Sequence, residues 1–289
     1  MPFLATALVA ATLTAPPEGL ALGMPAEALR VELDRDCDAV TRHEPARAGF
    51  PLAVQEEVHW VCDGARSGAS ERAVFVVADG VLAFATFAGG SASFEPESQG
   101  FEMLGYRGWP EAGVVTHPES DTTWWLDADG LHANLFAWRH PLLDAEELSP
   151  WSSPTFTAPV EARLGEALEV LAPEIEAACA FTLTRELEPG LPTQPTTQTQ
   201  IDCFGYPVAG FPRKIEFVFG DGRLELVWIL TGRGEEDRLR ASLEADHGPA
   251  EALIPGFEFF DDRRVALRTD KPELMMASDA VLDAYFGGR

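Results

Sequence analysis

Lysine is almost absent from this chain of 289 residues, and positive charge as a whole is scarce. Lys214 and Lys271 are its two lysines, and 21 lysine and arginine residues stand against 47 aspartate and glutamate residues, for a net charge of −26. A field of that sign repels nucleic acid and anionic lipid surfaces. We therefore expect no nucleic-acid partner. The acid excess fits either solubility in a salty habitat or attraction of a basic protein partner or of cations.

Long apolar runs are also missing, because no stretch of the sequence reaches the roughly 20 residues that a membrane-spanning helix needs. The longest run lies at the N-terminus and contains small residues near Ala11 and Ala15. It is typical of a secretory signal peptide, although it lacks basic residues at its start. We expect residues 1–15 to be removed on export and the mature chain to have no integral membrane segment. A misassigned start or a buried apolar segment is the alternative.

The sequence lacks the local patterns of common catalytic and metal-binding sites. It contains no HExxH, no G-x-S-x-G, no P-loop and no dinucleotide-binding fingerprint. Asp127–Gly130 is similar to the start of a calcium loop, but the bidentate acid that should follow is replaced by Trp138, so we expect a hairpin turn there. We predict no catalytic residue, no cofactor and no metal site. The histidines are expected to be structural: His43, His59, His117, His132, His140 and His247.

Four cysteines form two similar pairs. There are 24 residues between Cys37 and Cys62 and 23 between Cys179 and Cys203. These spacings are too long for a redox motif or a zinc knuckle, so the pairs Cys37–Cys62 and Cys179–Cys203 are predicted to be disulfides. Closing a loop of this size contributes about 3 kcal/mol in the chain-entropy model. Disulfides also fit an exported protein.

The cysteine pairs belong to an internal duplication. Cys37 and Cys179 are 142 positions apart, and residues 73–90 align with residues 215–232 at the same offset without a gap. Leu22-Gly23 matches Leu164-Gly165 at that offset as well. Six pairs in the aligned segment are identical: Phe75/Phe217, Val76/Val218, Asp79/Asp221, Gly80/Gly222, Leu82/Leu224 and Gly90/Gly232. A register shared by separate segments indicates two copies of one domain.

Each copy is predicted to open with a helix, at 25–34 and 166–177, because apolar residues recur there at three-to-four-residue spacing. Two strands joined by a long loop follow, at 37–43 and 57–63 and again at 179–186 and 199–204, with the cysteines at their neighbouring ends. An apolar hairpin then turns at Asp79-Gly80 or Asp221-Gly222. The later expected elements are helices at 94–106, 235–246 and 279–286, and strands at 122–127, 131–138, 257–260, 264–269 and 274–277.

The predicted fold class is therefore α+β, with two tandem domains of a helix on an antiparallel sheet. We expect domain 1 at 20–147, a linker rich in serine, threonine and proline at 148–160, and domain 2 at 161–289. The segment 188–200 is rich in proline, threonine and glutamine, which favours a projecting loop, either a tolerated insertion or a binding element. The oligomeric state is not indicated.

Tryptophans are the candidate binding residues. In the pair Trp124-Trp125 on a strand, the two side chains must point to opposite faces of the sheet. The outward ring is expected either to be buried against other parts of the chain or to contact a ligand or protein. The candidate binding surface is Trp124, Trp125, Trp138 and Trp151.

The order of helix, disulfide-linked strand pair and Asp-Gly hairpin, repeated twice, resembles the architecture of secreted β-lactamase inhibitor proteins. It is also similar to the small outer-membrane assembly lipoproteins of that fold group. The resemblance implies a helix-covered sheet whose other face and loops bind proteins, and it assigns no functional residue. We expect an exported, non-catalytic binding or scaffold protein of the bacterial cell envelope, periplasmic or secreted. The alternative is an envelope hydrolase or carbohydrate-active enzyme with its site between the repeats.

Overall fold

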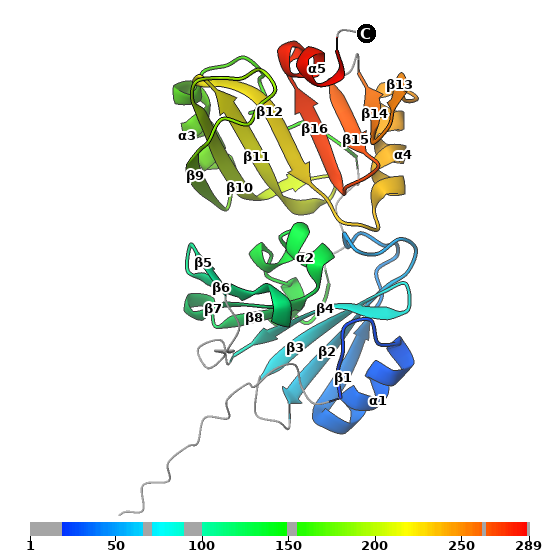
Figure 1. The fold of residues 1–289 in the computed structure, drawn as a ribbon. Helices are drawn as coiled ribbons and strands as arrows, with labels where there is room; N and C mark the ends of the chain where they lie inside the picture. Colours follow the sequence, from blue (N-terminus) through cyan, green and yellow to red (C-terminus); the bar gives the residue numbers. More distant parts are fainter. Residues whose placement is uncertain (1–18, 66–70, 90–99, 149–154, 262–263, 288–289) are drawn as a thin grey trace, which may run out of the picture. The chain divides into compact units, whose positions relative to one another are not determined.

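The computed structural model describes residues 19–65, 71–89, 100–148, 155–261 and 264–287 (Figure 1). The described chain divides into two compact units. Unit 1 holds the described residues up to Glu44, together with Val58–Asp127 and His140–Leu148. Unit 2 holds the described residues from Thr155 onward, and it also takes in Pro45–Glu57 and Ala128–Arg139 from the first copy of the repeat.

Unit 1 contains an antiparallel sheet of eight described strands in the order β1-β2-β3-β4-β8-β7-β6-β5. Its longer elements are α1 (Ala26–Asp36), β1 (Cys37–His43), β2 (Glu57–Ala65), β3 (Arg72–Ala78), β4 (Val81–Ala88), β5 (Phe101–Met103), β6 (Tyr106–Trp109), β7 (Val114–His117) and β8 (Thr122–Leu126). Short 3-10 turns lie at η2 (Pro110–Ala112), η3 (Pro118–Ser120) and η5 (Pro141–Leu143). Leu29 and Leu33 of α1 are buried against one face of this sheet.

Unit 2 contains a second antiparallel sheet of eight described strands, in the order β9-β10-β11-β12-β16-β15-β14-β13. Its elements are α3 (Leu168–Ala178), β9 (Phe181–Leu187), β10 (Gln198–Val208), β11 (Phe211–Gly220), β12 (Arg223–Leu230), α4 (Glu236–His247), β13 (Ala252–Ile254), β14 (Phe257–Phe260), β15 (Val265–Arg268), β16 (Glu273–Ala277) and α5 (Asp279–Phe286). Also in this unit are α2 (Ala128–His132) and η4 (Leu135–Ala137). In Figure 1, α3 and α4 cover one face of this sheet and α5 lies on the other.

The two sheets have the same strand order, so the predicted duplication and the α+β fold class are confirmed. The backbone repeats in detail as well. Gly23 donates from its N–H to the carbonyl of Leu82, and Gly165 donates in the same way to Leu224. Both glycines have positive φ, 80° and 83°. The matching Leu-Gly pairs therefore mark the point where the chain crosses the hairpin before entering the first helix.

The Asp-Gly pairs form the predicted tight turns. Asp79 and Gly80 have φ of 49° and 82°, and Asp221 and Gly222 have 46° and 75°. Two successive positive φ angles are the requirement of the type I′ hairpin turn, whose twist matches that of the strands it joins. The turns thus fix the registers of β3 with β4 and of β11 with β12.

Both predicted disulfides are confirmed, each inside one copy. Cys37–Cys62 and Cys179–Cys203 each join Cα atoms 5.5 Å apart. Cys37 and Cys179 are also the residues at which α1 and α3 end, so each bond ties the end of a helix to the second strand of its sheet. No helix within the described ranges is both long and apolar enough to cross a membrane.

The helix predicted at 94–106 is wrong for its described part. Phe101–Met103 and Tyr106–Trp109 are strands β5 and β6, which pair as a hairpin, while residues 94–99 lie outside the described residues. Leu104 and Gly105 between them have φ of 52° and 83°. A leucine in that conformation is unusual, so a turn at this position was not predictable from residue type.

The strand predicted at 131–138 and the turn predicted at 127–130 are also wrong. Ala128–His132 forms helix α2, and Leu135–Ala137 forms a 3-10 turn after Asn134, whose φ is 54°. Leu135 and Phe136 are both buried although they are neighbours in sequence. The left-handed backbone at Asn134 turns the chain between these two short elements, which an extended strand does not allow.

Candidate binding surface

Trp124 and Trp125 lie on β8 with their side chains on opposite faces of the first sheet, as the strand pairing requires. Trp125 is paired with Ala85 and Val114, which belong to the core under α1, and Trp124 is paired with Thr86 and Val115. The exposed fractions of the two tryptophans are 3% and 6%. Both rings therefore belong to the interior of the described chain.

Trp138 lies in unit 2 and is 9% exposed. Its ring centroid is 5.0 Å from that of Phe211 and 6.0 Å from that of Phe50. Trp151 lies outside the described residues. The prediction that these tryptophans bind a partner stays a prediction, and the buried state of the three described rings gives it no surface to act through.

A different set of polar and aromatic side chains lies on the face of the second sheet that carries α5, and most of them are half-buried. Val281 and Leu282 of α5 pack with Met275 and Ala266 in one cluster on this face. Across the sheet the pairing continues from Met275 to Trp228, then to Glu216 and Asp202. We call the charged and aromatic part of this face, which begins at the edge of the α5 cluster, the charged face. It comprises Phe181, Arg185, Asp202, Phe204, Lys214, Glu216, Trp228, Phe257, Arg268 and Glu273, with Asp270 at its rim.

Asp202 is the centre of one ionic group on the charged face. Its side chain is 2% exposed, and its carboxylate lies 2.6 Å from Arg185 Nη2 and 3.3 Å from Lys214 Nζ. Gln200 donates to it from Nε2 at 2.7 Å. Lys214 also contacts Glu216 at 2.6 Å. Because a buried carboxylate is stable only when it is paired, these contacts hold the cations in place over the sheet.

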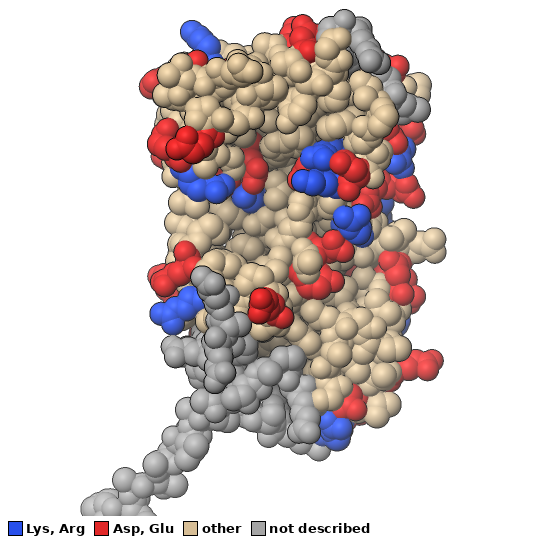
Figure 2. Space-filling view, viewed as in Figure 1, with Lys and Arg blue, Asp and Glu red and all other residues tan. Residues whose placement is uncertain are grey.

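Arg268 is the centre of a second ionic group. It lies 5.4 Å above the ring centroid of Trp228 and 5.3 Å from that of Phe257, within cation–π range of both. It also donates to Asp270 at 2.7 Å and to Glu273 at 2.8 Å. The hydrogen bond from Arg268 lowers the pKa of Asp270 below its usual value. Figure 2 shows the resulting mixture of positive and negative side chains on this side of the second sheet.

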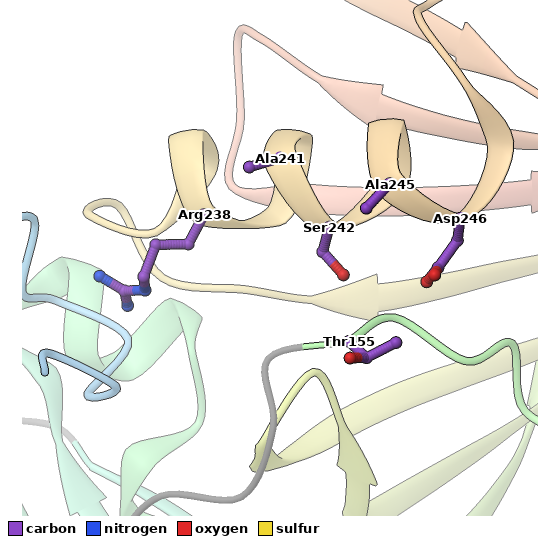
Figure 3. A pocket seen from close by; sticks show the side chains of 6 residues that line it. All are labelled: Thr155, Arg238, Ala241, Ser242, Ala245 and Asp246. Atoms are coloured by element: carbon purple, nitrogen blue, oxygen red, sulfur yellow. The ribbon is translucent and has the colours of Figure 1, made fainter.

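A shallow pocket of about 350 Å³ lies beside α4, also within unit 2 (Figure 3). Its lining is Thr155, Arg238, Ala241, Ser242, Ala245 and Asp246. The Ser242 hydroxyl accepts a hydrogen bond from Phe156 N, and Arg238 donates to the carbonyls of Phe50 and Ala53. Ser242 and Arg238 are thus engaged in holding neighbouring segments on α4.

The segment 188–200, predicted to project, is fixed on unit 2 instead. Asp221 accepts from the N–H groups of Thr196 and Thr197 at 2.9 and 3.0 Å. Gln198 accepts from Gly190 and Leu191, and Leu191 joins the cluster under α5. Because backbone groups and an apolar side chain are satisfied within the unit, this segment supports the sheet rather than reaching away from it.

The charged face has no contiguous signal in the sequence, because its members come from seven strands. The available signal was the alternation on β10 and β11, where polar Gln200, Asp202, Lys214 and Glu216 interrupt otherwise apolar strands. Among the residues that the structure describes, no group of three or more His, Cys, Asp and Glu side chains is arranged to hold a metal ion.

Comparison of the chain with known protein families, with curated proteins and with solved structures gives no match. The resemblance to β-lactamase inhibitor proteins therefore rests on the layout of the repeats. No residue role can be transferred to this chain from a similar protein, so the properties of the charged face follow from its own side chains.

Proposed function

We propose that the chain is an exported, non-catalytic binding protein of the bacterial cell envelope, and that the charged face of unit 2 binds a basic protein partner. Two disulfides, each closing one copy of the repeat, support an oxidising compartment outside the cytoplasm. The duplicated fold supplies a rigid support for a binding surface in such a compartment.

The observation that carries the proposal is the arrangement of Arg268 against Trp228 and Phe257. Arginine and tryptophan dominate the binding energy of protein interfaces, chiefly where their side chains are already held in place. Here two carboxylates and two aromatic rings fix the guanidinium before any partner arrives. A surface ordered in advance loses little conformational entropy on binding, which favours affinity.

The net charge expected of the partner follows from the charge of this protein. The charged face carries four carboxylates, those of Asp202, Glu216, Asp270 and Glu273, against three cations, and the whole chain carries a net charge of −26. The field of the protein therefore attracts a positively charged protein and accelerates its approach, and the effect weakens as salt is added. An acidic or nucleic-acid partner would meet repulsion over the same surface.

Site-specific photo-cross-linking in the full chain, in an envelope fraction, tests the proposal. One variant carries the photoreactive side chain at Arg185 on the charged face, and the matched control carries it at Val170, which is 45% exposed on α3. We expect the first variant alone to give an adduct with a protein of net positive charge, in a yield that falls at high salt. Equal adducts at both positions, no adduct at position 185, or an adduct with an acidic protein would contradict it.

A further inference from the structure

Residues His140–Leu148 form a strap across the first sheet, within unit 1. Leu142 and Leu143 of the strap are buried with Val61 of β2 and Val74 of β3 in one apolar cluster. Farther along, Arg72 donates to the carboxylate of Glu146 at 2.9 Å and to the carbonyl of Ala145 at 3.0 Å. The strap is thus held by an apolar contact in its middle and by an ion pair near its end.

Two histidines hold the beginning of the strap. His140 Nε2 lies 2.8 Å from Nδ1 of His59 on β2, and both residues are 0% exposed. The pair joins residues 81 positions apart in sequence. Among the described residues it is not part of a three-ligand metal cluster, so its chemistry is that of a hydrogen bond between two imidazoles.

The protons of the pair can be assigned from its neighbours. His140 Nδ1 accepts a hydrogen bond from the backbone N–H of Leu142 at 3.1 Å, so it carries no proton. Neutral His140 must then carry its proton on Nε2 and donate it to Nδ1 of His59. Both rings are neutral in this arrangement. His140 Nδ1 accepts from Leu142, His140 Nε2 donates, and His59 Nδ1 accepts.

We propose that the His59–His140 pair is an acid-sensitive latch, which holds the strap on the sheet when both rings are neutral and releases it when the pair takes up a proton. A proton added to His140 at Nδ1 would face the N–H of Leu142. A proton added to His59 at Nδ1 would point at the Nε2–H of His140. If His140 instead moved its own proton from Nε2 to Nδ1, that proton would point at the N–H of Leu142. Every route sets a donor against a donor and breaks one of the bonds that hold the strap.

The surroundings of the pair make proton uptake costly in the closed state. Burial lowers the pKa of His140 well below its ordinary value, and the nearby His59 and His43 lower it further. The pKa of His43, beside His59 on β1, is lowered by burial, by His59 and by Arg72, while Glu146 and Glu147 raise it. Asp63 on β2 and Asp144 in the strap both raise the pKa of Arg72, and Arg139 directly precedes His140 in the sequence.

The direction of the pH effect follows from these shifts. An open strap exposes His140, whose pKa then returns to about 6.5, so the open state binds more protons than the closed state below that pH. The strap is therefore fully held above about pH 7, and it loosens as the pH falls below about 6.5. Opening uncovers Val61 and Val74, which gives the sheet an apolar patch in acid that is covered at neutral pH.

The chain contains an internal comparison for this latch. His117 precedes Pro118 and caps η3 through its Nδ1, which accepts from Ser120 N at 3.3 Å, just as His140 precedes Pro141 and caps η5. His117 is partly exposed and stacks on Tyr106 with ring centroids 4.5 Å apart. It has the same capping role without the buried histidine partner, so it supplies a matched control for substitutions in the pair.

Hydrogen exchange of the full chain, with its disulfides intact, measures opening of the strap directly. Amide exchange of residues 140–148 is followed at pH 7.5, 6.5 and 5.5 and corrected for the intrinsic rate at each pH. We expect the open fraction of the strap to rise about tenfold from pH 7.5 to 5.5. Carboxylates titrate below this range, so they do not contribute to the change.

Two variants complete the test. His140→Asn keeps an oxygen that can accept from Leu142 N–H but takes up no proton, so its strap should exchange at a rate that no longer depends on pH after correction. His117→Asn is the matched control and should keep the full tenfold response of the strap. The proposal is overturned if the corrected exchange of the wild-type strap is unchanged between pH 7.5 and 5.5, or if both variants abolish the response.

Discussion

At the scale of single residues, the ion pair of Arg213 and Glu235 is deeply buried in unit 2. The two side chains are 2% and 3% exposed and are joined by hydrogen bonds of 2.5 and 2.8 Å. Glu235 also accepts from Gly232 N at 2.7 Å, directly before α4. The pair therefore sets where the strand β12 ends and the helix begins.

Glu235→Gln should destabilise the protein by about 3 kcal/mol, because it leaves a buried guanidinium without its counter-charge. Urea denaturation at pH 7 measures the change. The control is Glu174→Gln, which breaks the ion pair with Arg163, where both partners are more than 40% exposed. That change should leave the urea midpoint close to that of the wild type, because solvent screens an exposed ion pair. Equal losses for the two variants would show that burial of the pair does not matter.

The residue scale is also where the sequence was least informative. A lone histidine such as His59 or His140 gave no sign of its partner, because the contact depends on how two distant segments cross. Trp124 and Trp125 were correctly predicted to face opposite sides, since that follows from strand geometry alone. Their burial on both sides could not be predicted, because it depends on what packs over each face.

At the scale of elements, the Asp-Gly hairpins join two neighbouring strands in each sheet, β3 to β4 and β11 to β12. Gly222 has φ of 75°, and a Cβ added to it would meet no heavy atom within 4 Å. A substitution there would therefore act through backbone conformation and not through crowding. The equivalent Gly80 has the same open surroundings.

Gly222→Ala should cost about 1–2 kcal/mol, the penalty for an L-residue in the left-handed region. The control, Gly190→Ala, lies in the same unit at an ordinary φ, and its added Cβ would come no closer than 3.9 Å to another atom. It should change stability by less than about 0.5 kcal/mol. Thermal unfolding of both variants beside the wild type provides the measurement, and a Gly222→Ala protein as stable as Gly190→Ala would contradict the turn assignment.

Elements with strong local signals were predicted well from the sequence. Strands 37–43 and 257–260 and helix 279–286 have the predicted bounds, and the helices at 25–34, 166–177 and 235–246 differ by two residues or fewer at each end. The failures at 101–106 and 131–137 share a cause. In both, a residue other than glycine adopts a positive φ, Leu104 in one and Asn134 in the other, and the turn that results has no clear sequence pattern.

At the scale of the whole molecule, the duplication was readable from the sequence because its matches serve the fold. The Leu-Gly crossing, the cysteines and the Asp-Gly turn recur at nearly constant offsets and make the same contacts in both copies. Both proposed functional features lie in parts of the chain that differ between the two copies. The charged face belongs to the second sheet, and the histidine latch belongs to the first.

The assignment of binding to the charged face is the central claim, and the affinity of the cross-linked partner tests it most directly. Once cross-linking has identified that protein, its Kd is measured for the wild type, for Trp228→Ala and for the matched control Val170→Ala at the same ionic strength. We predict that Trp228→Ala weakens binding at least about tenfold, because Arg268 loses a ring on which it stacks, and that Val170→Ala leaves the Kd unchanged. Equal affinity of the wild type and Trp228→Ala would contradict the account.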